Sequence, residues 1–338
     1  MPVILASLLN FLVNPLGLYP THWLPPTEQN LRRYKHDQVQ QLGLRPSTVV
    51  LGSSRVMTMR SSDVERYLPG DCYNFSMQSA AAEDWYAALR LLVDDLHAPV
   101  KHVIIGVDFE AFNPAIPTMS ESRYFPDFSK YLLHTKLRSR TLDQFSLLLS
   151  AEQLDATKGV ITSQFERKNK SQNKIVEADG TLLLRDRESL IASGKFDLEK
   201  VLDGRVRKYA SRSLRLAGYA KPSPERLQYL EDLLNFADQR GITVHMYVTP
   251  YHPRLWEVLR PLPGTKVLRE TTRLVQQHCQ AHGVYLVDFS RIDRFGGKPD
   301  EFYDEIHMWP SNQARLLQYL FAQEKMSTQR LGLAGAAP

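Results

Sequence analysis

Three side chains from distant parts of the chain have the types and spacing of a serine-hydrolase active site. Ser54 lies in the segment GSSR (residues 52–55), and Asp304 and His307 share the segment DEIH. A serine hydroxyl is a poor nucleophile at neutral pH, so it needs a base within hydrogen-bond reach and a carboxylate that orients the base. One helical turn or a tight loop brings residues at this spacing to the same side. We therefore expect Ser54 as nucleophile, His307 as general base and Asp304 as its orienting group.

Apolar runs and helical patterns alternate along the chain and predict a parallel α/β fold. Five short runs are apolar and rich in β-branched and aromatic residues, which is typical of strands. They are residues 48–51 (TVVL), 71–75 (DCYNF), 102–107 (HVIIGV), 242–248 (ITVHMYV) and 284–289 (VYLVDF). Helical spacing of apolar residues is found in 80–96, 225–239, 266–282 and 310–323. Such alternation, with right-handed crossovers, predicts a three-layer α/β/α sandwich around a five-stranded, mostly parallel sheet.

The candidate residues follow the predicted strands. Reactive groups in parallel α/β folds lie at the carboxyl ends of strands. Ser54 comes directly after the first run, Asp108 after the third and His252 just beyond the fourth, while Asp304 and His307 follow the fifth. We expect these groups to meet at one edge of the sheet. There the glycine before the two serines allows close approach, and amides at a helix start can stabilise an oxyanion.

We assign the α/β pattern to a domain at residues 45–325. An insertion interrupts this pattern. Residues from about 114 to 222 include a leucine-rich helical stretch at 142–151, a polar run at 164–174 and a hairpin signal at Asp179-Gly180. We interpret this region as an inserted lid.

Both ends of the chain lie outside the predicted domain. Residues 3–13 are mostly apolar but too few to span a bilayer comfortably. They are similar to the apolar core of a signal peptide or signal anchor at residues 1–20, although no basic segment precedes them. A buried helix is the alternative. Residues 327–338 are polar and rich in glycine and alanine, and we predict a disordered tail.

At this point the chain resembles the SGNH (GDSL-type) hydrolase superfamily over about residues 47–323, with the insertion left out. GSS at 52–54 resembles the Gly-Asp-Ser block with Ser54 as nucleophile, and DEIH at 304–307 matches the family's Asp-x-x-His. NFSMQS at 74–79 resembles the second block, in which a glycine donates its backbone N–H to the oxyanion, and Ser79 falls on that glycine. The resemblance implies a flavodoxin-like SGNH fold and an acyl-serine intermediate, with no metal or organic cofactor.

Asp108 is the main departure from the family pattern. GVD at 106–108 resembles the third block, Gly-x-Asn, whose asparagine amide completes the oxyanion hole. An ionised carboxylate there would repel a developing oxyanion. Either Asp108 is protonated or turned away, or the donor comes from elsewhere. The candidate donors are Asn113, Arg55, Tyr251 and His252. Arg55 has a second interpretation, as a structural ion-pair partner of Asp108 or Glu110.

Further motifs are similar to a membrane-anchored bacterial branch of this superfamily. They are NPLGLY at 14–19, GSSR at 52–55, and GVDF at 106–109 followed by FN at 112–113. The layout resembles that of teichoic-acid D-alanyl transfer and alginate O-acetylation proteins. It implies acyl transfer or ester hydrolysis on an acylated cell-envelope glycan or a small acyl donor. The implied location is the bacterial inner membrane, facing the periplasm or cell exterior and associated through the N-terminus, with a membrane-bound acyltransferase as partner.

Asp108 favours a rival class, a catalytically silent module that binds glycan or such an acyltransferase. A purely structural envelope protein is a third class. The aromatic residues Trp85, Trp256 and Trp309 could stack on sugar rings. We expect Trp85 in the core and Trp309, two residues after the base, beside the site.

Composition is that of an ordered globular protein, since 43% of the 338 residues are hydrophobic and 23% are charged. The net charge of +5 comes without a long basic run, so we expect no nucleic-acid partner. The two cysteines, Cys72 and Cys279, form no metal-type cluster. They either pair in one disulfide or remain as two buried thiols.

Overall fold

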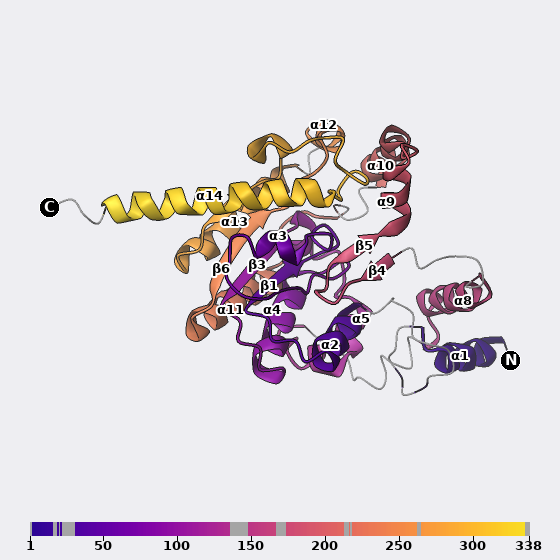
Figure 1. The fold of residues 1–338 in the computed structure, drawn as a ribbon. Coiled ribbons are helices and arrows are strands. Elements are labelled where there is room, and N and C mark those ends of the chain that lie inside the picture. The colour runs from indigo at the N-terminus through magenta and orange to yellow at the C-terminus, as the bar shows by residue number, and fades with distance from the viewer. Residues whose placement is uncertain are drawn as a thin grey trace. The chain divides into compact units, whose positions relative to one another are not determined.

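The structure is a computed structural model that describes residues 2–15, 19, 21, 31–135, 148–166, 174–212, 216, 218–261 and 265–334 (Figure 1). The chain divides into two compact units. One comprises Met1–Gly43 and Thr118–Asn173, and the other comprises Leu44–Pro117 and Lys174–Pro338. All the candidate site residues belong to the second unit, which we call the α/β unit.

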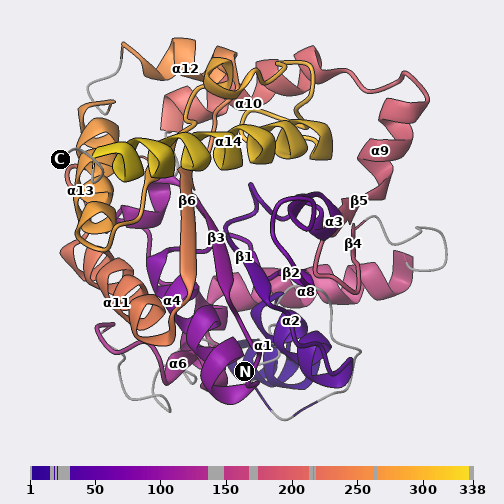
Figure 2. The same cartoon turned by 60° about the vertical axis from the view of Figure 1, so that its left-hand side comes forward.

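A five-stranded parallel sheet forms the centre of the α/β unit, and its strands β1, β3 and β6 run side by side in Figure 2. The strands are β1 (Thr48–Gly52), β2 (Cys72–Asn74), β3 (His102–Val107), β6 (Thr243–Val248) and β7 (Leu286–Asp288). Their order is β2-β1-β3-β6-β7, and every pairing is parallel. This is the 2-1-3-4-5 order of flavodoxin-like folds. Each predicted run coincides with one of these strands, although β1 extends one residue beyond its run, and the sheet is entirely rather than mostly parallel.

Helices cover both faces of the sheet, which confirms the predicted three-layer sandwich. On one face α4 (Ala82–Arg90) packs against β1, α11 (Pro224–Arg240) against β6, and α13 (Thr265–Ala281) against β7. A π-helical turn, η1 (Leu91–Asp95), continues α4. The other face, which carries Val50 and Ile104, packs in one hydrophobic cluster with residues of α14 (Pro310–Ala334) and α3 (Ser61–Val64). Strand side chains alternate between faces, so each strand contributes to both layers of core.

Residue types typical of helix ends are found at the ends of α11 and α13. Ser223 caps α11 by accepting a hydrogen bond from the N–H of Arg226 at 3.3 Å, and Gly241 ends the helix with φ 62°. Gly283, which follows α13, likewise has positive φ, at 68°. These conformations suit glycine, which has no Cβ to clash.

Trp85 and both cysteines lie in the core. Trp85 is fully buried and lies edge-on to Phe112, with ring centroids 6.0 Å apart, so it is a core residue as expected. Cys72 and Cys279 are buried free thiols. Burial raises the pKa of each to about 12, so both are unreactive at neutral pH.

The predicted insertion is divided between the two units. Its second part belongs to the α/β unit and begins with a hairpin of β4 (Lys174–Val176) and β5 (Leu182–Leu184), whose turn holds Gly180 at φ 80°. This confirms the hairpin predicted at Asp179-Gly180. Helices α9 (Arg185–Ala192) and α10 (Leu198–Arg212) follow. The remaining short elements of this unit are η2 (Phe109–Phe112), α12 (Pro253–Leu259) and η3 (Ile292–Phe295).

The first part of the insertion belongs to the other unit, which is helical. Its elements are α1 (Pro2–Val13), α2 (Leu31–Gln41), α5 (Ser120–Tyr124), α6 (Pro126–Ser129) and α8 (Ala151–Glu166). Asn10 of α1 donates to the carbonyl of Leu148 at 2.9 Å and accepts from the Thr157 hydroxyl at 2.7 Å. The predicted apolar stretch 3–13 is thus helical. Most of the predicted 142–151 helix and of the 164–174 polar run lies outside the described residues.

Among the described residues, none of the helices combines the length and apolar character needed to cross a membrane.

The predicted tail at 327–338 differs from the structure, in which α14 continues to Ala334. Residues 335–338 lie outside the described part. The reason is cooperative propagation, because extending a helix that is already formed costs far less than starting one. The sequence QRL within this stretch consists of good helix formers.

Candidate active site

The nucleophile turn follows β1 and depends on its last residue. Gly52 has φ 146°, and a Cβ there would lie 2.6 Å from the Val56 Cγ2 atom and 3.0 Å from the Gly106 carbonyl oxygen. Only glycine therefore fits without displacement. The Ser53 hydroxyl accepts a hydrogen bond from the Arg55 N–H at 3.2 Å, so Ser53 is a turn residue. Ser54 is half-buried, which leaves its hydroxyl within reach of a substrate.

A tight loop, rather than a helical turn, presents Asp304 and His307. The Tyr303 N–H donates to the His307 carbonyl at 2.8 Å, and the Trp309 N–H donates to the Glu301 carbonyl at 3.0 Å. The Thr58 hydroxyl, from the segment after the nucleophile turn, donates to the Met308 carbonyl at 3.1 Å. The loop is closed on itself and attached to the nucleophile segment.

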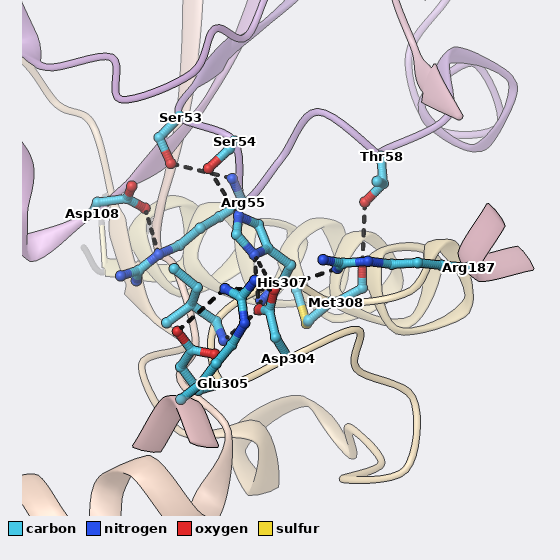
Figure 3. A network of polar contacts seen from close by, with 12 residues as sticks. Ser53, Ser54, Arg55, Thr58, Asp108, Arg187, Asp304, Glu305, His307 and Met308 are labelled. Atoms are coloured by element: carbon cyan, nitrogen blue, oxygen red, sulfur yellow. Dashed lines mark hydrogen bonds and ion pairs between the residues drawn. The ribbon is translucent and has the colours of Figure 1, made fainter. Parts of the chain in front are cut away.

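The structure brings Ser54, His307 and Asp304 into one hydrogen-bonded chain (Figure 3). The Ser54 Oγ and the His307 Nε2 are 2.9 Å apart. The His307 Nδ1 lies 2.8 Å and 2.9 Å from the two carboxylate oxygens of Asp304. All three distances lie in the range expected for a nucleophile, a base and an orienting group.

The charge of Asp304 fixes the direction of these hydrogen bonds. Burial, which leaves 1% of the side chain exposed, would by itself raise the pKa of Asp304. Attraction to His307, hydrogen bonds from His307 and the Ile306 N–H, and the nearby Arg205 outweigh burial and hold this pKa well below its usual range. An ionised carboxylate only accepts, so the His307 Nδ1 carries a proton and donates it. The Nε2 lone pair is then free to accept from the Ser54 hydroxyl.

Two arginines from the inserted helices also reach Asp304, and the sequence analysis did not identify them. The Arg187 guanidinium of α9 donates to Asp304 Oδ2 at 3.4 Å, and that of Arg205 on α10 lies 3.5 Å from the same atom. Both side chains are partly exposed. No local signal marks them, because they lie more than ninety residues before the loop that they contact.

Arg55 is buried in a network at the ends of β1, β3 and β6. Its guanidinium donates to Glu110 at 2.7 Å and to the Thr249 hydroxyl at 3.1 Å, and it lies 3.6 Å from Asp108. The Thr249 hydroxyl in turn donates to Asp108 at 2.6 Å. The ion-pair interpretation of Arg55 is therefore confirmed, and this cation offsets the Asp108 charge close to Ser54 (Figure 3).

Two backbone features bear on the binding of an oxyanion. Within the described part of the chain, the Ser54 N–H donates to no acceptor. Ser79, the predicted backbone donor, is buried and has φ 57°, a left-handed conformation that favours glycine. Ser79 thus adopts the backbone geometry that a glycine in the same place would adopt.

The other donors considered from the sequence have partners elsewhere. The Asn113 Oδ1 accepts from the Ala115 N–H at 2.9 Å, and the Tyr251 hydroxyl donates to Glu110 at 2.8 Å. His252 caps α12 through Nδ1, which accepts from the Arg254 N–H at 3.2 Å, and its Nε2 then donates to the Pro299 carbonyl at 3.1 Å. Burial lowers the pKa of His252. The positions of these residues after the strands could not show that their side chains bind neighbouring groups of their own loops.

In the described part of the chain, His, Cys, Asp and Glu side chains form no group of three or more that could hold a metal ion. Comparisons of the sequence with protein-family models and with curated proteins give no match.

Proposed function

We propose that the protein carries out serine-dependent acyl transfer or ester hydrolysis through an acyl-serine intermediate. The observation that carries this proposal is the chain of hydrogen bonds from Ser54 through His307 to Asp304, with 2.9 Å between the nucleophile and the base. A buried ionised carboxylate, a correctly oriented imidazole and a reachable serine hydroxyl are what nucleophilic activation requires.

The reaction proceeds in two balanced steps. The Ser54 Oγ attacks the acyl carbonyl carbon while His307 Nε2 takes the hydroxyl proton. The bond to the leaving oxygen then breaks, and that oxygen takes the proton from Nε2, which leaves an acyl-serine. Water or an acceptor hydroxyl next attacks the acyl carbon and gives its proton to Nε2. The bond from that carbon to the Ser54 Oγ then breaks and Oγ takes the proton back, which releases the acid or the transferred ester and restores the serine. Throughout, Asp304 holds the imidazole and stabilises its cationic form.

The oxyanion of each tetrahedral intermediate is held by backbone donors in this proposal. The N–H groups of Ser54 and Ser79 serve this role, and no side-chain amide contributes at position 108. Asp108 is tolerated because Arg55 offsets its charge and the Thr249 hydroxyl binds it. An oxyanion hole with one donor fewer stabilises the intermediate less, which favours a slow reaction on a selected substrate over general esterase activity.

The resemblance to membrane-anchored SGNH-type proteins supplies the proposed substrate and place. The substrate class is an acylated cell-envelope glycan or a small acyl donor, handled on the outer side of the bacterial inner membrane. The N-terminal segment associates with the membrane, and a membrane-bound acyltransferase is the partner class. The motifs at residues 14–19, 52–55 and 106–113 support these proposals.

A catalytically silent module that binds glycan or an acyltransferase is the second candidate. The observation in its favour is Asp108, which places an acceptor where the resembling family has an amide donor.

Incubation with p-nitrophenyl acetate tests the proposal. Nitrophenol release reports turnover, and the intact mass with peptide mapping reports an acetyl group on Ser54. Ser54→Ala should abolish both signals. Ser53→Ala is the matched control, because its neighbouring hydroxyl only accepts from a backbone N–H, and it should retain both. Equal signals from wild type and Ser54→Ala would refute the nucleophile assignment, and no acetylation of wild type would favour the silent module.

A further inference from the structure

Two hollows flank Trp309 within the α/β unit, between the inserted helices and the loops at the carboxyl edge of the sheet. The larger is about 750 Å³ and the smaller about 490 Å³. Both volumes lie in the range of small-molecule sites. Ile191 of α9 and Trp309 line both hollows, whereas Ser54 and His307 line neither of the two. The hollows therefore lie beside the reacting atoms rather than around them.

Trp309 offers these hollows an aromatic surface. It is half-buried, with Phe196 edge-on at 6.4 Å and Tyr303 tilted at 6.1 Å between ring centroids. Its indole Nε1 is buried and has no hydrogen-bond partner among the described residues. A buried donor without a partner is unfavourable, and the part of the indole that lines the hollows is its apolar surface.

The charges of the larger hollow are nearly balanced. Lys195 and Arg254 face three carboxylates, and Arg254 forms an ion pair with one of them, Glu199, at 2.5 Å. Lys195 and the two remaining carboxylates, Asp197 and Asp300, form no ion pair in the described part of the chain. An acyl chain would leave these groups desolvated at a cost, so they disfavour a lipid occupant. They suit a neutral ligand with many hydroxyl groups.

We infer that the two hollows are neighbouring subsites for an oligosaccharide of neutral pyranose rings, at least two sugars long, whose chain crosses Trp309. Flat apolar ring faces pack on the indole, while hydroxyl groups bind Lys195 and Asp300. Trp309 follows His307 by two residues, so the hollows adjoin the loop that carries the proposed base. The role of this chain as acyl acceptor or donor rests on the proposed function, but its binding does not.

Titration of the wild-type protein with cellotetraose and N-acetylchitotetraose, followed by saturation-transfer NMR and calorimetry, tests the inference. At least one of the two should bind saturably, and more tightly than the anionic tetragalacturonate. Trp309→Ala should weaken binding roughly tenfold or more, because the aromatic surface shared by both hollows is lost. Trp309→Phe should retain the larger part of the affinity. Tyr319→Ala, which removes an aromatic residue 40% exposed on α14, is the matched control and should bind as wild type does.

Absence of saturable binding of both neutral tetrasaccharides at millimolar concentration would overturn the inference. So would an unchanged affinity in Trp309→Ala, an equal loss in the Tyr319→Ala control, or tighter binding of tetragalacturonate. Ser54 acetylation measured on the same samples separates the two proposals. Trp309-dependent binding without acetylation refutes the acyl-serine mechanism alone, and acetylation without binding refutes the subsites alone.

Discussion

Replacing Asp304 by asparagine tests the central geometry with the smallest change of shape. The Oδ1 atom accepts from the Ile306 N–H at 3.1 Å and the His307 N–H at 2.9 Å, and an asparagine oxygen can keep both bonds. The other position becomes an NH₂ donor that faces His307 Nδ1. We expect this donor to bind the Nδ1 lone pair in competition with the remaining oxygen, which is 2.8 Å from Nδ1. The imidazole then carries its proton on Nε2, where it can no longer accept from the Ser54 hydroxyl.

The expected loss follows from this reversed tautomer. In a serine–histidine–aspartate arrangement such a change lowers kcat by about 10⁴-fold, which corresponds to about 5.5 kcal/mol of transition-state stabilisation. We expect Ser54 acetylation by p-nitrophenyl acetate to slow by that order in Asp304→Asn, with a thermal melt and near-UV spectrum that show a folded protein.

Glu305→Gln is the matched control for this experiment. Glu305 is adjacent and buried and lies 3.8 Å from Arg205, and glutamine removes its charge with little change of shape. Its side chain makes no hydrogen bond to His307 within the described structure. We expect acetylation within about threefold of wild type. An Asp304→Asn rate within tenfold of wild type, or equal losses in both variants, would refute the proposed role of Asp304.

Three further predictions concern the scaffold. Gly52→Ala should lower the free energy of unfolding by about 1–3 kcal/mol in urea melts, because of its positive φ and close neighbours. Gly204→Ala, in an open helical position of α10, should be neutral or stabilise by up to about 1 kcal/mol. Arg226→Met should cost about 3–5 kcal/mol, because the buried Glu83, 3.0 Å away, loses its cation; an unchanged urea midpoint would contradict this. Burial opposes the charged form of His282, but hydrogen bonds to two carboxylates of α11 outweigh it and raise its pKa. A raised pKa contributes stability that is complete below the unfolded value and lost as pH rises through the folded one. Wild type should therefore exceed His282→Gln in stability by more at pH 5.5 than at pH 8.5, and a pH-independent difference would exclude this ion pair as the cause.

The sequence could predict residues whose positions follow from the regular alternation of strands and helices. The runs at 48–51 and 102–107 show strands by composition, and parallel pairing then places Ser54 and Asp108 at one edge. The short spacing of Asp304 and His307 likewise places these two side chains on the same side of one turn or loop. These inferences need only local pattern and general topology.

Contacts that depend on side-chain direction could not be predicted. His252 also follows a strand, but its ring turns back to cap α12. Arg187 and Arg205 reach Asp304 only because the second part of the insertion belongs to the α/β unit. No local sequence pattern predicts this packing. The extent of α14 was underestimated because composition describes isolated segments, whereas a helix propagates from its formed part.

The long separation between the nucleophile and its base has a consequence for biosynthesis. Ser54 and His307 are 253 positions apart, and the loop that carries His307 comes after the last strand of the sheet. A chain that emerges from its N-terminus therefore carries its serine for most of synthesis without the group that activates it. During that period the hydroxyl is as inert as any other serine. Under the proposed mechanism, acyl chemistry starts only when the last part of the chain has joined the sheet.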